Sequence, residues 1–265
     1  MNHSYWHIQT TEKPLFPDIE WNRPEQRAHA GKLVIIGGNK LGFTAISEAY
    51  AVAEKLGAGQ IKAILPDALK KAVPSSVTET HFIPSNISGG FSKEALTDLI
   101  AAASWSDVCL LAGDTGRNSE TAMAFEALMA EYSGQLVITR DAVELFKPVA
   151  QRLCEREQTT LVLSFAQLQK LFQSLYYPKI LSFSMQLMQL VEALHKFTIT
   201  YPVTIVTFHH NQLIVTHDGK VVSQEFSEPM QIWRGVTATR AACYLLWSPT
   251  KPLEAIATSF VQNHV

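Results

Sequence analysis

The sequence alternates short apolar runs with helical segments, and this alternation allows only a few architectures. The run Lys32–Gly38 (KLVIIGG) ends in glycines and precedes Phe43–Leu56, which has helical spacing and is rich in alanine. Gly57–Gly59 then ends the helix before a second apolar run, Gln60–Pro66 (QIKAILP). The order strand, turn, helix and strand predicts a β-α-β unit with two parallel strands.

The same alternation continues along the chain. Further helices are expected at 93–104, 119–132 and 184–197 and near Ala238 and Leu253, and further strands at 108–112, 135–138, 161–163, 203–208 and 212–216. The Asp218–Gly219 pair between two apolar runs predicts a hairpin over Gln212–Val222, because such a turn needs positive φ at both central residues. The sequence therefore predicts an α/β fold: a mostly parallel sheet, helices on both faces and an antiparallel edge hairpin.

One folded domain accounts for most of the chain. It has 265 residues, 47% of them hydrophobic, and no Pro-, Gly- or Ser-rich linker divides it. Residues 1–28 are polar, aperiodic and contain prolines, so we expect an N-terminal arm that lies on the domain or on a neighbouring molecule. Residues 29–265 are then expected to form a single domain.

Charge and composition argue against several functions. A net charge of -2 and the absence of a Lys/Arg run speak against nucleic acid as a partner. No run of about 18 apolar residues is present, so we expect no membrane partner and a cytoplasmic protein. Cys109, Cys154 and Cys243 lie far apart, without the close pairs of zinc sites, so we expect reduced core thiols and no metal site.

The most specific motif lies in Gly31–Pro66. A Gly-Gly turn leads from a strand into a helix N-terminus, where backbone N–H groups and the helix dipole favour an anion. The segment resembles the opening of the ADP/ATP-dependent NAD(P)H-hydrate dehydratases of the ribokinase-like superfamily. Gly38 and Ala45 are in register, Asn39 stands where a serine is usual, and Thr44 where a glycine is usual. A tight turn that binds no ligand is the alternative.

Similarity to this family in element order and spacing covers roughly residues 29 to 264. It implies a three-layer ribokinase-like sandwich and a homo-oligomer. The ligands implied by the resemblance are small molecules: ADP or ATP with Mg²⁺, and an NADPH-type dinucleotide.

Two loops keep part of the family's motifs. In the family a strand runs into G-P-G-x-G; here Gly116 is retained, and Gly113 and Asp114 replace the Pro and the Gly. In the later D-A-D-A-L motif, Asp141 is in register and Thr139 replaces the first Asp. The substrate-binding residues implied by the resemblance are Gly38, Asn39, Ala45 and Gly116.

Three other motifs are lost. Phe165 and Ala166 stand where the family has a histidine that helps hold the hydrated nicotinamide, and Phe208 stands where a lysine binds phosphates. In the superfamily's G-T-G-D signature the glycines form an anion hole and the Asp is the acid/base group, but here Thr239 takes the place of that Asp. The implied nucleotide-binding residues are His209, His210, Gly235, Thr237 and Ala238, with Ala238 at the second glycine.

The sequence leaves two functions open for this degenerate member of the family. In the first, the chain is a carbon-oxygen lyase that removes water from NAD(P)HX with ADP or ATP. No intact catalytic residue is identified, and Asp114, Asp141 and the imidazoles of His209 and His210 are the candidates for proton transfer. In the second, the fold is a non-catalytic nucleotide-binding or protein-interaction module. The combined loss of acid, lysine and histidine favours impaired catalysis.

Overall fold

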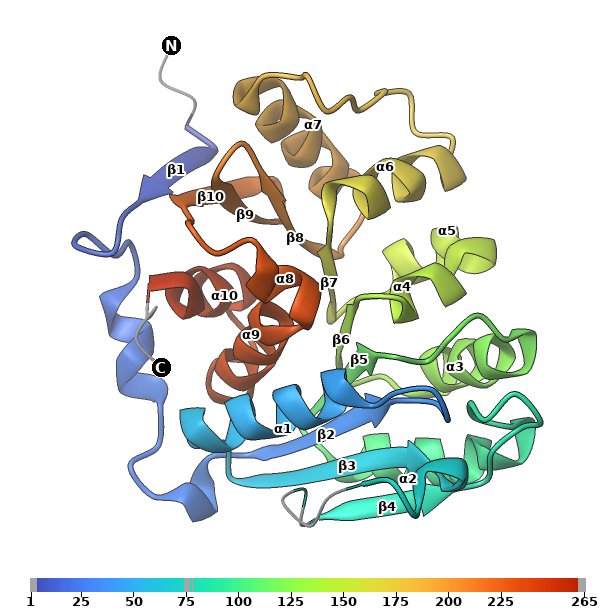
Figure 1. Cartoon of the computed structure of the whole chain (residues 1–265). Coiled ribbons are helices and arrows are strands. Elements are labelled where there is room, and N and C mark those ends of the chain that lie inside the picture. The colour runs from blue at the N-terminus through green and yellow to red at the C-terminus, as the bar shows by residue number, and fades with distance from the viewer. Residues whose placement is uncertain (1–3, 74–76, 78, 262–265) are drawn as a thin grey trace.

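A ten-stranded sheet runs through the molecule in the order β1-β10-β9-β8-β7-β6-β5-β2-β3-β4 (Figure 1). The computed structural model describes residues 4–73, 77 and 79–261. The strands are β1 (Trp6–Gln9), β2 (Lys32–Gly37), β3 (Gln60–Pro66), β4 (Thr80–Ile83), β5 (Val108–Gly113), β6 (Gln135–Thr139), β7 (Thr159–Leu163), β8 (Thr204–His209), β9 (Gln212–His217) and β10 (Lys220–Glu225).

The strands from β2 to β8 pair in parallel, whereas β9 is antiparallel to both β8 and β10. The hairpin turn between β9 and β10 has positive φ at Asp218 and Gly219, 46° and 69°. The predicted mostly parallel sheet with an antiparallel hairpin is therefore confirmed.

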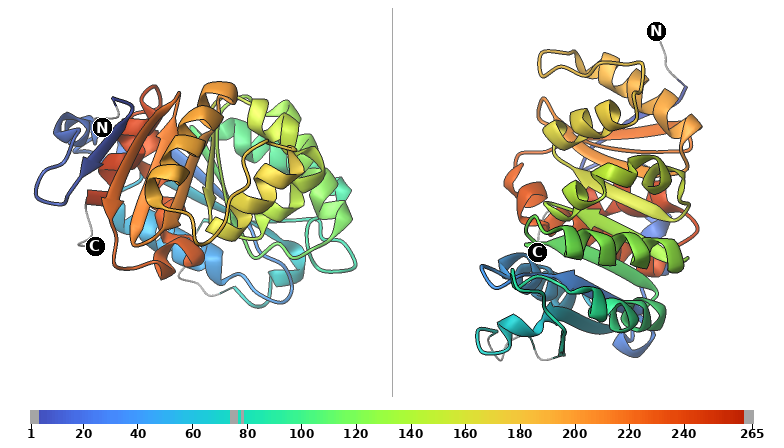
Figure 2. Two further views of the ribbon diagram at one scale, coloured as in Figure 1. Left: turned by 90° about the horizontal axis from the view of Figure 1, so that it is seen from above. Right: turned by 90° about the vertical axis from the view of Figure 1, so that its right-hand side faces the viewer.

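Helices cover both faces of the sheet (Figure 2). Their bounds are α1 (Thr44–Leu56), α2 (Leu96–Trp105), α3 (Ser119–Glu131), α4 (Ala142–Leu145), α5 (Ala150–Glu155), α6 (Phe165–Ser174), α7 (Leu187–Thr200), α8 (Met230–Arg234), α9 (Val236–Trp247) and α10 (Pro252–Val261). One buried cluster packs the helices from α2 through α7 against one face of the sheet. A second cluster packs α1, α8, α9 and α10 against the other face. The three layers expected from the sequence are present.

Alternate residues of the central strands enter the two clusters. In β2, Val34 and Ile36 face one helix layer while Leu33 and Ile35 face the other, and all four are fully buried. A strand covered on both faces needs apolar residues at every position, which explains the unbroken run in this part of the sequence.

The sequence pattern does not predict the two edge strands, β1 and β4. β1 lies within the segment expected to be an arm, and it pairs in parallel with β10 beyond the hairpin. Its Gln9 is buried and donates from Nε2 to the Ala257 carbonyl at 2.7 Å and to Gln224 Oε1 at 3.0 Å. Both strands have four residues, too few to show a period of two.

Helix α7 begins later than expected. Gln186 and Gln189 form a capping box at its N-terminus, so the helix starts at Leu187 and not at Ser184. The three cysteines are buried and free, as predicted, and burial raises the pKa of each thiol to about 12. The described ranges contain no helix that combines the length and the hydropathy of a membrane span.

Candidate functional site

The parallel strands β2 and β5 to β8 end at one edge of the sheet, where open α/β folds bind their ligands. The loop after β5 lies at this edge and is held by Asp141, which follows β6. The amide nitrogens of Asp114 and Gly116 donate to the Asp141 carboxylate at 2.7 and 2.9 Å, and the Thr115 hydroxyl donates to it at 3.2 Å. Asp141 therefore fixes the shape of this loop.

Asp114 connects this loop to two others. Its Oδ2 accepts a hydrogen bond from the amide of Ala45, in the first turn of α1, at 2.7 Å. Its carbonyl accepts one from Asn39 Nδ2 at 2.5 Å, and a Cβ atom at Gly116 would lie 3.3 Å from the same nitrogen. The structure thus brings together the four residues that the resemblance assigns to substrate binding, Gly38, Asn39, Ala45 and Gly116.

Arg140 lies at the centre of the site. Its Nη2 forms an ion pair with Asp114 Oδ1 at 2.5 Å, and its Nη1 donates to the carbonyl of Trp233 in α8. A Cβ atom at Gly235 would lie 3.4 Å from Arg140 Cδ. The Arg140 backbone is left-handed (φ 57°), which costs about 1–3 kcal/mol in a non-glycine residue. Its side chain joins the loop after β5 to α8.

Sequence reasoning does not identify Arg140. The sequence feature that could have indicated Arg140 is its charge, since it is the middle residue of Thr139–Asp141 (TRD), where the family motif D-A-D has alanine. The distance to α8 could not be read from the sequence, because Trp233 is 93 residues away along the chain.

The N-terminus of α9 carries the remains of the glycine-rich signature. Gly235 caps it with φ 89°, and the first N–H groups of a helix have no acceptor within the helix. Thr237 and Ala238 are buried there, and Thr237 Oγ1 has no hydrogen-bond partner in the described part of the chain. Thr239 is fully buried and donates from its hydroxyl to the Gly235 carbonyl at 3.0 Å. The terminus favours an anion, but Thr239 gives it no ionisable group.

A cleft of about 780 Å³ opens beside Arg140, in the size range of small-molecule sites. Its walls come from the ends of β6, β7 and β8, from the loops that follow β5 and precede α7, and from α4, α6 and α8. They carry Arg117, Thr139, Arg140, Asp141, Glu144, Val162, Ser164, Phe165, Ala166, Gln167, Lys170, Phe183, Phe208, His209, His210, Ile232 and Trp233. The predicted residues Asp141, His209 and His210 line this cleft.

The other predicted residues do not line the cleft. Gly38, Asn39, Ala45 and Gly116 lie beyond the Arg140–Asp114 pair, and Gly235, Thr237 and Ala238 lie at the start of α9. The predicted site residues therefore fall into three groups around Arg140.

His209 and His210 share one hydrogen-bond acceptor. Their Nε2 atoms lie 2.9 and 3.1 Å from the carbonyl oxygen of Met185. A carbonyl oxygen only accepts, so each Nε2 carries a proton. His209 is buried, with 6% of its surface exposed, and burial lowers its pKa. His209 is therefore a neutral imidazole near pH 7.

Four aromatic rings form one wall of the cleft. Phe183 lies 4.9 Å from Phe165, Phe165 stacks on His209 at 4.5 Å, and His209 meets His210 at 4.0 Å, measured between ring centroids. Phe208, at the position of the family's lysine, lines the cleft as well. The positions where the family has a histidine and a lysine thus carry aromatic rings, which pack against planar apolar groups.

The carboxylates of the site are already engaged by the protein. Both oxygens of Asp114 and both oxygens of Asp141 accept hydrogen bonds from neighbouring donors. Within the ranges that the structure describes, no group of three or more His, Cys, Asp or Glu side chains is placed to hold a metal ion. Mg²⁺ is usually held through one or two carboxylates together with ligand phosphates. In this structure Asp114 and Asp141 therefore serve to hold the loops around the site.

The His209 imidazole makes stability depend on pH. Its pKa is lowered by burial and by the neighbouring His210, while the bond to Met185 opposes the shift. The unfolded chain, whose histidines titrate at about 6.5, then binds more protons than the folded chain below that pH. We expect the free energy of unfolding to fall as the pH is lowered from about 7 to about 5. His209→Gln should reduce this fall in urea unfolding at several pH values.

His217 provides the internal comparison for this experiment. Burial lowers its pKa too, against the opposing effects of Asp218 and Glu254, so part of the pH dependence remains in His209→Gln. An unchanged pH dependence in that variant would show that His209 does not contribute.

Comparison with known proteins gives the fold. No family model matches the sequence, and no curated protein matches it. A ribokinase-like superfamily protein from Enterococcus faecalis superposes with a TM-score of 0.71 and 17% identity, over 98% of this chain and 87% of that chain. A hypothetical protein from Streptococcus mutans has a TM-score of 0.68 and 17% identity, over 91% and 84%.

An ADP/ATP-dependent NAD(P)H-hydrate dehydratase from Bacillus subtilis, co-crystallised with ATP/Mg²⁺, is also similar. Its TM-score is 0.59 at 13% identity, over 93% of this chain and 85% of that chain. At such identities the likeness concerns the fold alone. The chain has the ribokinase-like fold, and its structural neighbours include NAD(P)H-hydrate dehydratase.

Proposed function

We propose that this chain is a catalytically impaired relative of the NAD(P)H-hydrate dehydratases, which binds a nucleotide without dehydrating NAD(P)HX or transferring phosphate. The observation that carries this proposal is the bridge that the Arg140 side chain forms between the loop after β5 and α8, called the Arg140 bridge below. The Arg140 side chain forms an ion pair with Asp114 and donates a hydrogen bond to the Trp233 carbonyl. It lies between the cleft and the group formed by Gly38, Asn39, Ala45 and Gly116. A nucleotide in the cleft is then separated from a substrate in that group.

The proposal is supported by the absence of a suitable proton carrier at the start of α9. Thr239 is fully buried, its hydroxyl is bonded to the helix backbone, and a threonine hydroxyl does not ionise near neutral pH. Asp114 and Asp141 hold loops through every carboxylate oxygen. A general base must lie within hydrogen-bond reach of the proton that it removes, and these oxygens are directed at protein donors.

Nucleotide binding, in contrast, has the features it needs. The cleft has room for a small molecule, a wall of aromatic rings for a planar base, and cationic side chains at Arg117, Arg140 and Lys170. The N-terminus of α9 with Gly235 and Thr237 adds an anion-favouring site close to Arg140. A planar ring joined to phosphate fits this combination.

Calorimetric titration with ADP, ATP and NADPH, together with an absorbance assay for the recovery of NADPH from NADPHX, tests the proposal. We expect nucleotide binding and no turnover. Ala166→Trp, on an exposed residue that lines the cleft, should weaken nucleotide binding at least about tenfold by filling it. The control Ala51→Trp adds the same ring on the exposed side of α1.

The outcomes separate the two functions that the sequence left open. Turnover of NADPHX with ADP or ATP would disprove the impairment and mean that Asp114, Asp141 or His209 has taken over proton transfer. Failure of all three ligands to bind would disprove nucleotide binding and favour a protein-interaction module.

A further inference from the structure

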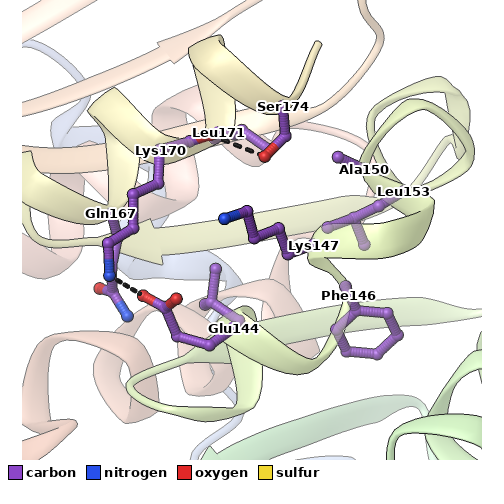
Figure 3. Close-up of a pocket in the computed structure, with 10 residues that line it drawn as sticks. Glu144, Phe146, Lys147, Ala150, Leu153, Gln167, Lys170, Leu171 and Ser174 are labelled. Carbon is purple, nitrogen blue, oxygen red and sulfur yellow. Dashed lines mark hydrogen bonds and ion pairs between the residues drawn. The ribbon is translucent and has the colours of Figure 1, made fainter.

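The cleft continues past the residues that would hold a base. A second hollow of about 440 Å³ lies between the N-terminus of α3, the segment from α4 to Pro148 and α6. It shares Arg117, Glu144 and Lys170 with the main cleft. A small pocket of about 20 Å³, which also contains Glu144 and Lys170, lies between α4, α5 and α6 (Figure 3). The three hollows therefore adjoin around Glu144 and Lys170.

This second hollow concentrates positive charge in a chain whose net charge is -2. Arg117, Lys147 and Lys170 line it together with one carboxylate, Glu144. Lys170 Nζ pairs with Glu144 Oε1 at 3.0 Å. Among the residues that the structure describes, the side chains of Arg117 and Lys147 form no ion pair or hydrogen bond.

The close-up shows how these side chains lie. Lys147 extends from the turn after α4 into the space between α4 and α6, and its ammonium group points toward the Lys170–Glu144 pair without reaching it (Figure 3). Two unpaired cations and a paired one in a concave surface raise the local concentration of anions. Glu144 offsets the charge of only one of them.

We propose that Arg117, Lys147 and Lys170 form a second anion-binding subsite, which takes the distal phosphate groups of a nucleotide whose base lies in the main cleft. This inference rests on the proposed function, since it assigns the far end of the same ligand. When phosphate binds, Lys170 exchanges Glu144 for a phosphate oxygen, and Arg117 and Lys147 gain their first anionic partner. The subsite therefore selects ligands by the number of their phosphates.

Calorimetric titration of the full chain with adenosine, AMP, ADP and ATP, at low and at physiological salt, tests this subsite. We expect affinity to rise with phosphate number and to fall with salt. Lys147→Gln and Arg117→Gln should each weaken ATP binding about tenfold. Because Lys147 lines the second hollow and not the main cleft, Lys147→Gln should leave adenosine binding unchanged. Lys251→Gln removes one positive charge from an exposed position outside the hollows and should leave both affinities unchanged.

Glu144→Gln gives a readout that a purely structural role would not give. It frees Lys170 from its partner, so ATP should bind more tightly than to the original protein. Equal affinity for adenosine and ATP, or unchanged ATP affinity in Lys147→Gln and Arg117→Gln, would overturn the subsite while leaving nucleotide binding intact. Absence of binding by all four ligands would overturn both proposals.

Discussion

Gly37→Ala is expected to lower the free energy of unfolding by about 3 kcal/mol, because the added methyl group has no space. A Cβ atom at Gly37 would lie 2.3 Å from the Gly113 carbonyl oxygen and 2.6 Å from Ile46 Cδ1. The first contact is with backbone, at the point where the register of β2 and β5 shifts. Relief of the clash would require the two central strands to separate. Urea unfolding followed by circular dichroism measures the loss.

Gly42→Ala is the matched control for this substitution. It adds the same methyl group in the loop that follows β2, yet no atom lies within 4 Å of its Cβ position. We expect a change of less than about 0.5 kcal/mol. Similar stability of the two variants would contradict the packing argument. Because the Gly38 amide donates to the same Gly113 carbonyl at 2.9 Å, Gly37→Ala should also disturb the loop that carries Asp114.

Asp141→Ala is expected to cost about 3 kcal/mol and to weaken nucleotide binding as well. The substitution leaves the amides of Asp114 and Gly116 and the hydroxyl of Thr115 without their acceptor. Hydrogen bonds to a charged acceptor contribute about 1.5–3 kcal/mol each, and part of this loss is recovered where water reaches the loop. The loop then no longer holds Asp114 against Arg140. Unfolding in urea and calorimetric titration with ATP measure the two effects.

Asp98→Ala serves as the control, since it removes a carboxylate from the exposed face of α2. Its effect on stability should stay within about 0.5 kcal/mol. Asp141→Asn should lie between the two variants, because its amide keeps one acceptor oxygen but turns a donor toward the loop. A stable Asp141→Ala protein with unchanged ATP affinity would mean that the loop keeps its shape without the carboxylate.

The central part of the fold was predictable from the sequence because its signals are local. The segment from Lys32 to Pro66 shows a strand, a glycine turn, a helix and a second strand within one stretch of chain, and the structure has β2, α1 and β3 there. The Asp218–Gly219 turn is equally local, since its backbone conformation depends on two residues. β1 was not predictable, because its partner β10 lies more than 200 residues away.

The candidate site likewise combines residues that the sequence indicated with contacts that only the tertiary structure shows. The sequence indicated Gly38, Asn39, Ala45 and Gly116 through short motifs, and it located the loss of an acid at Thr239. It did not indicate that Arg140 would reach both Asp114 and α8. Nor did it indicate the aromatic wall, in which Phe165, Phe183 and His209 meet although they come from α6, the following loop and β8.

By itself the sequence determined the order and type of the central elements, because apolar periodicity and glycine turns act over a few residues. The tertiary structure decided which ends of strands meet, and with them the Arg140 bridge, the cleft and the group of cations at Arg117, Lys147 and Lys170. Those contacts join residues far apart in the chain. Their distances depend on the strand order of the sheet, which no local pattern encodes.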